Sequence, residues 1–217
     1  MLRSYAGPGL AEGDPPRHTG CVLTTLDTQQ LVWHEELEHP RLRALVEVVR
    51  ANPSLPPIDV VPAGDSFLII DGAHRARAAA VNGRTVRARV HELDPSIQVP
   101  GWSHALSPAN SRRLTRRAER PRPGSCAAAL DFDAGRLNLE HHDGSPAAVH
   151  RALHAVADTA YHHGHLRLEP GVLLPPGCGV LTWSGLPLAT IIEVAATIGP
   201  LPAGVTRFAS LIRRPSR

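Results

Sequence analysis

The sequence predicts an α/β (α+β) protein made of two units, and three observations support this. Apolar runs of strand length alternate with longer segments in which apolar residues recur at helical spacing. An Arg-rich stretch followed by a Pro-Gly break separates two groups of such elements. Hydrophobic residues make up 42% of 217 residues, which is enough to build a core. We expect a loose tail over 1–20, a first unit over 21–108, a connector over 109–125 and a second, smaller α/β unit over 126–217.

The first unit shows clear boundary signals. Proline at a first helical position and Asn-Gly at a helix end are typical of helix starts and stops. Apolar runs bounded by Gly, Pro and Asp are typical of strands. The expected elements are a strand at 31–33, a helix from Pro40 to Asn52, strands at 58–61 and 67–70, an Ala-rich helix ending at Asn82-Gly83, and a strand at 85–90.

The second unit is expected to begin with a hairpin, because two alternating segments flank Asp133-Ala134-Gly135. A helix then opens at Pro146, with apolar residues recurring on one face. The expected elements are the hairpin strands at 127–132 and 137–140, the helix through Ala160, strands at 165–168 and 178–183, a helix opening at Pro187, and a last strand at 205–212.

The chain contains no lysine, since all 23 basic residues are Arg. This excludes mechanisms that need an amine, such as a P-loop lysine, a Schiff base or PLP attachment, and the strand lysine of protein kinases. Any phosphate chemistry must therefore depend on Arg, His, backbone amides or a metal.

The cysteines and the apolar runs indicate a cytoplasmic protein. Cys21, Cys126 and Cys178 lack metal-site spacing and cannot pair evenly, which is typical of free thiols in a reducing compartment. No apolar run approaches the roughly 18 residues of a membrane span. We expect no membrane partner.

The formal net charge is +3, and the positive charge is concentrated in the second half. Six Arg lie between 112 and 122, and no aromatic residue is interleaved with them. A solvated connector is therefore expected rather than a nucleic-acid surface.

Seven of the 13 His lie between 141 and 165. His150 and His154 are one helical turn apart and could share a metal, but neither Cys nor paired carboxylates accompany them. We expect surface or hinge residues here rather than a metal site.

The segment Asp71-Gly72-Ala73-His74-Arg75 is the sharpest local signal. It joins a buried strand to the first turn of a helix, where unpaired amides and the helix dipole attract phosphate. His74 and Arg75 add side-chain donors. Asp71 could cap the helix, hold Arg75 or bind Mg²⁺. From spacing alone, a purely structural role is as well supported as a phosphate site.

Two runs, Pro57-Ile-Asp-Val-Val and Phe67 through Val86, resemble the ParB/sulfiredoxin superfamily. Sulfiredoxins carry a catalytic Cys where this chain has Ala73, so their chemistry is not expected. Chromosome-partitioning ParB proteins carry a Gly-Glu-Arg-Arg box and a helix-turn-helix domain. This chain has Gly-Ala-His-Arg and a predicted hairpin, so partitioning is not expected either.

The remaining branch, the free-serine kinases, has an Asp-Gly-His-His-Arg type of turn that 71–75 resembles. Two further stretches are similar to this branch, Trp33-His-Glu-Glu and the segment from Leu186 to Arg207. The resemblance covers about 30–212. It implies a ParB/sulfiredoxin-like nucleotide-binding domain and a phosphotransferase with an alcohol acceptor, using ATP or ADP and Mg²⁺ to phosphorylate a free hydroxyl amino acid.

The resemblance also implies roles for individual residues. Glu35 would be the catalytic base, with Glu36 as the alternative, and the turn 71–75 would bind phosphate. Because the chain has no lysine, we expect Mg²⁺ to assist, with Asp71 as its candidate ligand. The substrate-binding residues would be Trp102, Thr206 and Arg207.

Two positions in the substrate loop depart from the branch, because Gly204 and Phe208 replace a Lys and a His. We therefore expect the acceptor to be serine, threonine or a related amino acid with extra carbon. The Arg-, Ala- and Pro-rich composition favours a specialised biosynthetic pathway. The alternative hypothesis is a ParB-like nucleotide-binding switch or DNA-associated regulator without kinase activity. The choice of ATP or ADP and the oligomeric state stay open.

Overall fold

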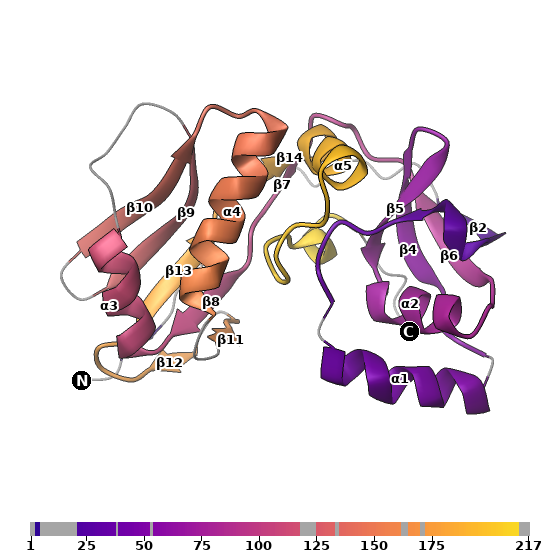
Figure 1. Ribbon diagram of the computed structural model, residues 1–217, viewed down its shortest axis with the longest axis horizontal. Coiled ribbons are helices and arrows are strands. Elements are labelled where there is room, and N and C mark those ends of the chain that lie inside the picture. The colour runs from indigo at the N-terminus through magenta and orange to yellow at the C-terminus, as the bar shows by residue number, and fades with distance from the viewer. Residues whose placement is uncertain are drawn as a thin grey trace. The chain divides into compact units, whose positions relative to one another are not determined.

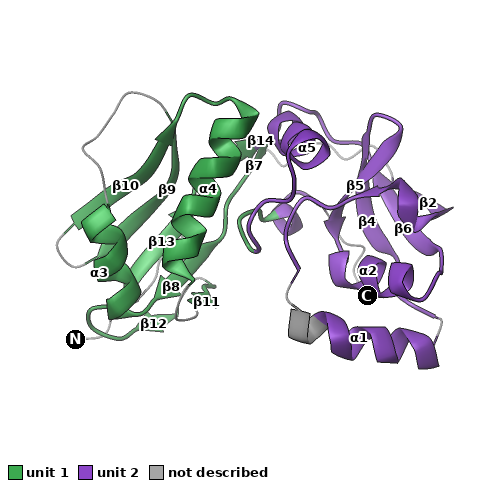
Figure 2. Cartoon of the chain, in the orientation of Figure 1, with its two compact units in different colours: residues 1–14, 98–186, 204–207 green, residues 15–97, 187–203, 208–217 purple. Residues whose placement is uncertain are grey.

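The computed structural model describes residues 3–4, 21–37, 39–52, 54–117, 125–132, 135–161, 165–169 and 172–212 (Figure 1). The chain forms two compact units, each assembled from separated stretches of sequence (Figure 2). Unit 1 comprises 1–14, 98–186 and 204–207, and unit 2 comprises 15–97, 187–203 and 208–217.

Unit 2 contains a five-stranded sheet with the order β2-β6-β4-β5-β3. Its strands are β2 (Cys21–Leu26), β3 (Leu31–Val32), β4 (Ile58–Ala63), β5 (Ser66–Asp71) and β6 (Val86–His91). β4 and β5 form an antiparallel hairpin, whereas β3 pairs with β5 and β6 pairs with β4 in parallel. Mixed pairing of this kind fits a sheet that receives helical crossovers.

The helices of unit 2 are α1 (His39–Ala51), α2 (Ala73–Val81) and α5 (Leu188–Thr197), with short 3-10 turns η1 (Thr28–Gln30) and η2 (Phe208–Ser210). α2 buries three alanines, whose small side chains let the helix pack closely on the sheet core. Side-chain amide and guanidinium groups at the end of α2 donate to carbonyls of α1, from Asn82 to Val46 at 3.3 Å and from Arg84 to Val49 at 2.8 Å. These bonds hold α1 against α2.

Unit 1 contains a second five-stranded sheet, with the order β10-β9-β13-β8-β11 and antiparallel pairing throughout. Its strands are β8 (Ser103–Leu106), β9 (Ser125–Phe132), β10 (Gly135–His142), β11 (His165–Arg167) and β13 (Gly179–Trp183). Two helices, α3 (Pro108–Arg117) and α4 (Pro146–Ala160), accompany the sheet (Figure 1). The face of α4 predicted to be apolar is buried.

Two pairs of very short strands complete the structure. β1 (Arg3–Ser4) pairs with β12 (Leu173–Leu174), and β7 (Gln98–Val99) pairs with β14 (Leu186–Pro187). Apart from β1, the predicted tail over 1–20 lies outside the described residues. Within the described ranges, no helix is both long and apolar enough to cross a membrane.

The predicted mixed α/β fold class is confirmed, but several local predictions differ from the structure. Strands β2 and β8 were not predicted. The connector over 109–125 is helical as far as Arg117, where α3 buries Asn110, Ser111 and Leu114 and exposes its arginines. The other half of that connector, 118–124, lies outside the described residues.

The last predicted strand, 205–212, is wrong. Thr206 forms only an isolated bridge to Gly101, and 208–210 is a 3-10 turn closed by a bond from Leu211 N–H to the Phe208 carbonyl at 2.8 Å. The buried residues Phe208, Leu211 and Ile212 are spaced by three and one, as in a helical turn, rather than by two as in a strand.

The predicted domain boundaries are continuous segments, whereas the observed units are not. Unit 2 takes in 187–203 and 208–217, because α5 and the residues after it bury apolar side chains such as Ile191, Leu201 and Phe208 there.

Candidate active site

The edge of the unit 2 sheet where β3 and β5 end brings two predicted site segments to the same level. The two strands run parallel, and Leu31 pairs with Phe67 and Val32 with Leu68. The pairing ends at Val32 and Leu68, so that Glu35 and Asp71 each follow the last paired residue of their strand by three positions. The ends of parallel strands meet at one edge, which is where open α/β sheets bind ligands.

Glu35 lies on an extended segment that is fixed by Leu201. The Leu201 N–H donates to the His34 carbonyl at 2.8 Å, and the Glu36 N–H donates to the Leu201 carbonyl at 2.8 Å. The Glu35 side chain is 17% exposed, whereas Glu36 is exposed. Between the two glutamates, Glu35 is therefore the one placed in a partly enclosed environment.

His34 is buried beside Glu35. Burial lowers the pKa of His34, against smaller opposing effects of the Glu35 carboxylate and a hydrogen bond with the backbone of Ile69. The imidazole Nε2 lies 4.0 Å from Glu35 Oε1, and the ring packs edge-on against Phe208 with centroids 5.2 Å apart. Near neutral pH the imidazole is uncharged, so this contact does not neutralise the carboxylate.

The strand-to-helix turn leaves its first amides without a side-chain cap. Gly72 is the N-cap of α2, with a left-handed φ of 89°, and no side chain caps the helix. The first helical bond runs from the Ala76 N–H to the Gly72 carbonyl at 3.0 Å. The absence of a side-chain cap is what the predicted phosphate site at these amides requires.

Asp71 and Arg75 are paired with each other across this turn. Arg75 Nη2 donates to Asp71 Oδ2 at 2.8 Å, while Arg75 Nη1 donates to the carbonyls of Pro56 at 3.1 Å and Pro57 at 2.7 Å. Of the three roles open to Asp71, the structure shows the pairing with Arg75. The guanidinium in turn holds the chain before β4 against the turn.

Ala73 and His74 are both half-buried, and Ala73 packs against the unit 2 core. The turn thus presents its backbone rather than long exposed side chains. The predicted phosphate site is in this respect mainly a backbone site.

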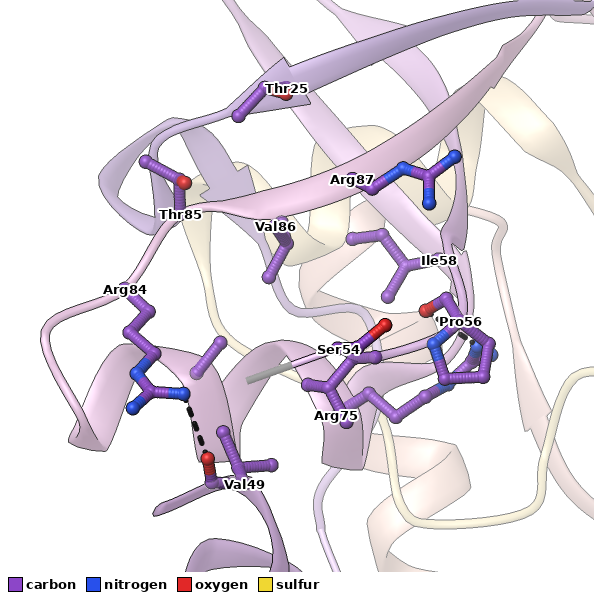
Figure 3. Close-up of a pocket in the computed structure, with 12 residues that line it drawn as sticks. Thr25, Val49, Ser54, Pro56, Ile58, Arg75, Arg84, Thr85, Val86 and Arg87 are labelled. Carbon is purple, nitrogen blue, oxygen red and sulfur yellow. Dashed lines mark hydrogen bonds between the residues drawn. The ribbon is translucent and has the colours of Figure 1, made fainter. Parts of the chain in front are cut away.

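A pocket of about 220 Å³ in unit 2 borders the turn (Figure 3). Arg75, Arg84 and Arg87 contribute to its wall, together with hydroxyl side chains such as Ser54 and Thr25. Sequence reasoning did not find this pocket, because its lining comes from five separate elements. Arg75 is the residue common to the pocket and the turn.

A buried ion cluster next to the turn was also missed. Asp59 on β4 is the register partner of Asp71 on β5 and of Arg89 on β6. Its carboxylate, in a side chain 4% exposed, lies 2.8 Å from His91 Nε2 and 3.5 Å from Arg89 Nη1. An acidic residue inside the apolar run Ile-Asp-Val-Val was the signal that could have identified it.

The three predicted substrate residues come together in unit 1. The Trp102 N–H donates to the Val205 carbonyl at 3.2 Å, and the Arg207 N–H donates to the Pro100 carbonyl at 2.8 Å. The Arg207 guanidinium lies 4.6 Å from the centroid of the Trp102 ring, and Thr206 is 7% exposed.

Two further charged residues accompany them. The Arg167 guanidinium lies 4.4 Å from the same Trp102 ring centroid, and Glu169 Oε2 lies 3.8 Å from Arg207 Nη2. Sequence reasoning missed both, since they lie in a short strand and the loop after it with no motif around them. The structure makes Trp102 the centre of a charged cluster.

Metal binding is supported only weakly by side-chain chemistry. Among the described residues, no group of three or more His, Cys, Asp or Glu side chains could hold a metal. The rings of His150 and His154 stack with centroids 4.2 Å apart. A Mg²⁺ carried by nucleotide phosphates needs only one or two protein carboxylates, and Asp71 fits that limited requirement.

Comparisons with known proteins identify the fold. Residues 21–99 match the ParB N-terminal domain. No curated protein sequence matches the chain.

The chain is similar in structure to SbnI from Staphylococcus aureus, with a TM-score of 0.66, 19% identity, and coverage of 85% of this chain and 81% of that one. It is also similar to a free serine kinase in complex with AMP, with a TM-score of 0.60, 16% identity and coverage of 90% of each chain. A conserved hypothetical protein from Pyrococcus furiosus gives a TM-score of 0.57 at 15% identity, covering 89% of this chain and 92% of that one. The chain therefore has the ParB/sulfiredoxin-like fold, as its sequence motifs predict.

Proposed function

We propose that this chain of ParB/sulfiredoxin-like fold is a small-molecule kinase that transfers a phosphoryl group from ATP or ADP to the side-chain hydroxyl of a free amino acid. The observation that carries the proposal is the parallel pairing of β3 with β5, because Glu35 and Asp71 each follow the last paired residue of these neighbouring strands by three positions. A carboxylate beside uncapped helix amides is the combination that phosphoryl transfer to an alcohol requires.

The chemical step follows from these groups. The acceptor hydroxyl oxygen forms a bond to the transferred phosphorus, the bridging P–O bond to the nucleotide breaks, and Glu35 accepts the hydroxyl proton. The amides of the first turn of α2 bind phosphate oxygens. Mg²⁺, held by Asp71 and the nucleotide, would supply charge neutralisation that lysine provides in other kinases.

On the acceptor side, we assign Trp102, Thr206 and Arg207 to substrate binding. We expect from the sequence that Phe208 favours an acceptor with extra carbon, and a direct contact with the acceptor does not explain that effect. Phe208 is 3% exposed and packs against His34, so it does not line an open site. Any influence of this residue on catalysis would pass through His34 to Glu35.

Related structures support the assignment. Free serine kinase structures similar to this chain contain AMP or ADP, and they include variants in which one glutamate is replaced by glutamine or alanine. A kinase of this fold therefore binds an adenine nucleotide, and one of its glutamates has been substituted.

The direct test incubates the full chain with ATP or ADP and with L-serine, L-threonine or L-homoserine, in the presence of Mg²⁺. Phosphorus NMR would detect the phosphoamino acid. We expect a product with at least one donor–acceptor pair. Absence of product in every pair, together with salt-sensitive binding to duplex DNA, would instead support the regulatory alternative.

Glu35→Gln tests the base, with Glu36→Gln as the matched control because its side chain is exposed. Glu35→Gln should lower kcat by about 10²-fold or more while leaving nucleotide affinity unchanged. Glu36→Gln should leave both unchanged. Retained activity in Glu35→Gln would refute the assignment of the base.

A further inference from the structure

In unit 1, His104 and Arg167 face each other across two paired strands. They are direct register partners in the antiparallel pair of β8 and β11. Side chains at such positions lie on the same face of the sheet with Cβ atoms about 5 Å apart. His104 is fully buried, whereas Arg167 is exposed. The pair therefore runs from the interior of unit 1 to its surface.

His104 is held in one protonation state by its surroundings. Burial, with the charges of His165 and Arg167, lowers the pKa of His104 to about 3. The imidazole is therefore neutral and carries one proton, on either Nδ1 or Nε2.

A chain of hydrogen bonds that ends at Nδ1 favours Nε2 as the site of that proton. The Trp183 Nε1–H can only donate, and it donates to the Tyr161 hydroxyl oxygen at 2.9 Å. The Tyr161 hydroxyl in turn lies 3.4 Å from His104 Nδ1, and donation of its proton to that atom leaves the imidazole proton on Nε2. Nε2 then carries the hydrogen, and among the described residues this buried atom has no hydrogen-bond acceptor. A buried donor without an acceptor indicates a ligand.

Gly204 lies beside both donors. A Cβ atom at this position would lie 3.1 Å from Arg167 Nη2 and 3.2 Å from His104 Nε2. Both nitrogens therefore face the loop that carries Thr206 and Arg207. A glycine here, with a left-handed φ of 77°, leaves this space without a side chain.

The charges around Trp102 favour a carboxylate over a phosphate dianion as the group that contacts Arg167. Arg207 is paired with Glu169, and His104 is neutral, whereas Arg167 has no acidic partner within ion-pair distance among the described residues. One positive charge is thus uncompensated next to the ring. A carboxylate matches this better than a phosphate dianion.

We propose that Arg167 and the Nε2–H group of His104 bind the carboxylate of a free amino acid, and that Glu169 binds its ammonium group. Glu169 follows Arg167 by two residues, with buried Leu168 between them, so both charged side chains leave the same side of the segment. A positive and a negative group at one aromatic ring suit a zwitterion. The inference deepens the proposed kinase function by naming the acceptor contacts, and it rests on that function for the fate of the ligand.

Binding without nucleotide is the first test, using calorimetry on the full chain with L-serine, L-threonine, ethanolamine, glycerate and inorganic phosphate. At least one amino acid should bind about ten times more tightly, or better, than either of two analogues. Ethanolamine lacks the carboxylate, and glycerate lacks the ammonium group. Inorganic phosphate binding as tightly as the amino acids would overturn the proposal.

Variants of the exposed residues give the second test. Arg167→Gln should weaken amino-acid binding about tenfold or more, while the matched control Arg113→Gln, an exposed arginine on α3, should leave it unchanged. Glu169→Gln should abolish the preference for the amino acid over glycerate. Equal amino-acid affinity in Arg167→Gln and Arg113→Gln would overturn the proposal.

Nitrogen NMR of His104 tests the buried donor without removing the ring. The spectrum should show the Nε2–H tautomer, and its proton resonance should shift when the amino acid binds. Tyr161→Phe, which keeps the ring but removes the hydroxyl, should reduce the preference for this tautomer. An Nδ1–H tautomer in the unchanged protein would refute the role of His104.

The outcomes separate this inference from the kinase proposal. If Arg167→Gln weakens binding but no phosphoamino acid ever forms, the carboxylate site stands and the kinase function fails. If the chain is a kinase whose KM for the amino acid is unchanged in Arg167→Gln, the function stands and the inference fails.

Discussion

His34 and Glu35 are adjacent in sequence but have different surroundings. The imidazole is buried against Phe208, whereas the carboxylate keeps partial access to solvent. A neutral His next to a candidate base fixes the segment without neutralising the base. The sequence motif indicated Glu35, but only the structure shows that Phe208 supports His34.

His104 makes the stability of the protein dependent on pH. Its pKa of about 3 in the folded state lies below the ordinary histidine pKa of 6.5, so the unfolded state binds more protons between these values. The stabilisation is complete above about pH 6.5 and is lost as the pH falls toward 3. Burial of His34 acts in the same direction.

We therefore expect the free energy of unfolding to fall between pH 7 and pH 5, with about 2 kcal/mol of the loss due to His104. Chemical denaturation at pH 7 and at pH 5 would measure this loss of unfolding free energy. His104→Gln should be less stable at pH 7 but should show a smaller loss on acidification. An equal loss in this variant would show that His104 is not the titrating group.

At the scale of elements, the connection from β5 to α2 depends on Gly72. Its φ of 89° favours glycine, and a Cβ there would lie 2.7 Å from both Arg75 Nη2 and Ile58 Cγ2. The same residue thus permits the left-handed turn, the Asp71–Arg75 pair and the packing of the helix on β4.

Gly72→Ala should destabilise the protein by about 1 kcal/mol through backbone strain and by a further 1–3 kcal/mol, roughly, through displacement of these neighbours. Gly64→Ala is the matched control, because Gly64 has a φ of 63° and no atom near the added Cβ. Thermal or chemical denaturation would compare the two. Equal losses of unfolding free energy in both variants would show that the contacts around Gly72 do not contribute to the destabilisation.

Elements with strong local signals were predicted well, whereas elements defined by distant partners were not. The hairpin of β4 and β5, helix α2 and helix α4 carry Gly, Asp or Pro boundaries and regular apolar spacing. Strand β2 has two exposed hydrophobic residues, Val22 and Leu23, and no clean alternation. Its pairing with β6 is what makes it a strand. Helix α3 was hidden by its arginines, because only Leu114 gives it a large apolar contact.

At the scale of the whole molecule, each unit needs residues from distant parts of the chain. Unit 2 obtains α5, Leu201 and Phe208 from the end of the sequence. The side chains of Leu188, Ile191 and Val194 are at most 1% exposed there. A chain that lacks this region therefore loses part of the unit 2 core and the backbone partner of Glu35.

A protein that ends after Leu186 should fail to fold unit 2, because each large side chain removed contributes about 1.5–3 kcal/mol and domains are stable by only about 5–15 kcal/mol. Circular dichroism and amide NMR dispersion would measure the loss. The control is a chain that ends after Ile212, which keeps all of these residues and should fold normally. Native-like dispersion of the shorter chain's residues 21–97 would contradict the expectation.

The sequence by itself determined the mixed α/β class, the strand-to-helix turn at 71–75 as a candidate phosphate site, the candidate base and the superfamily resemblance. Each of these depends on residues close together in the chain, where turn chemistry and spacing act locally. Only the tertiary structure decided that the strands before Glu35 and Asp71 are paired in parallel, that Arg75 is engaged with Asp71 and two carbonyls, and that His104 and Arg167 face each other. Those facts depend on strand register and on burial, which pair residues separated by tens of positions and which no local pattern encodes.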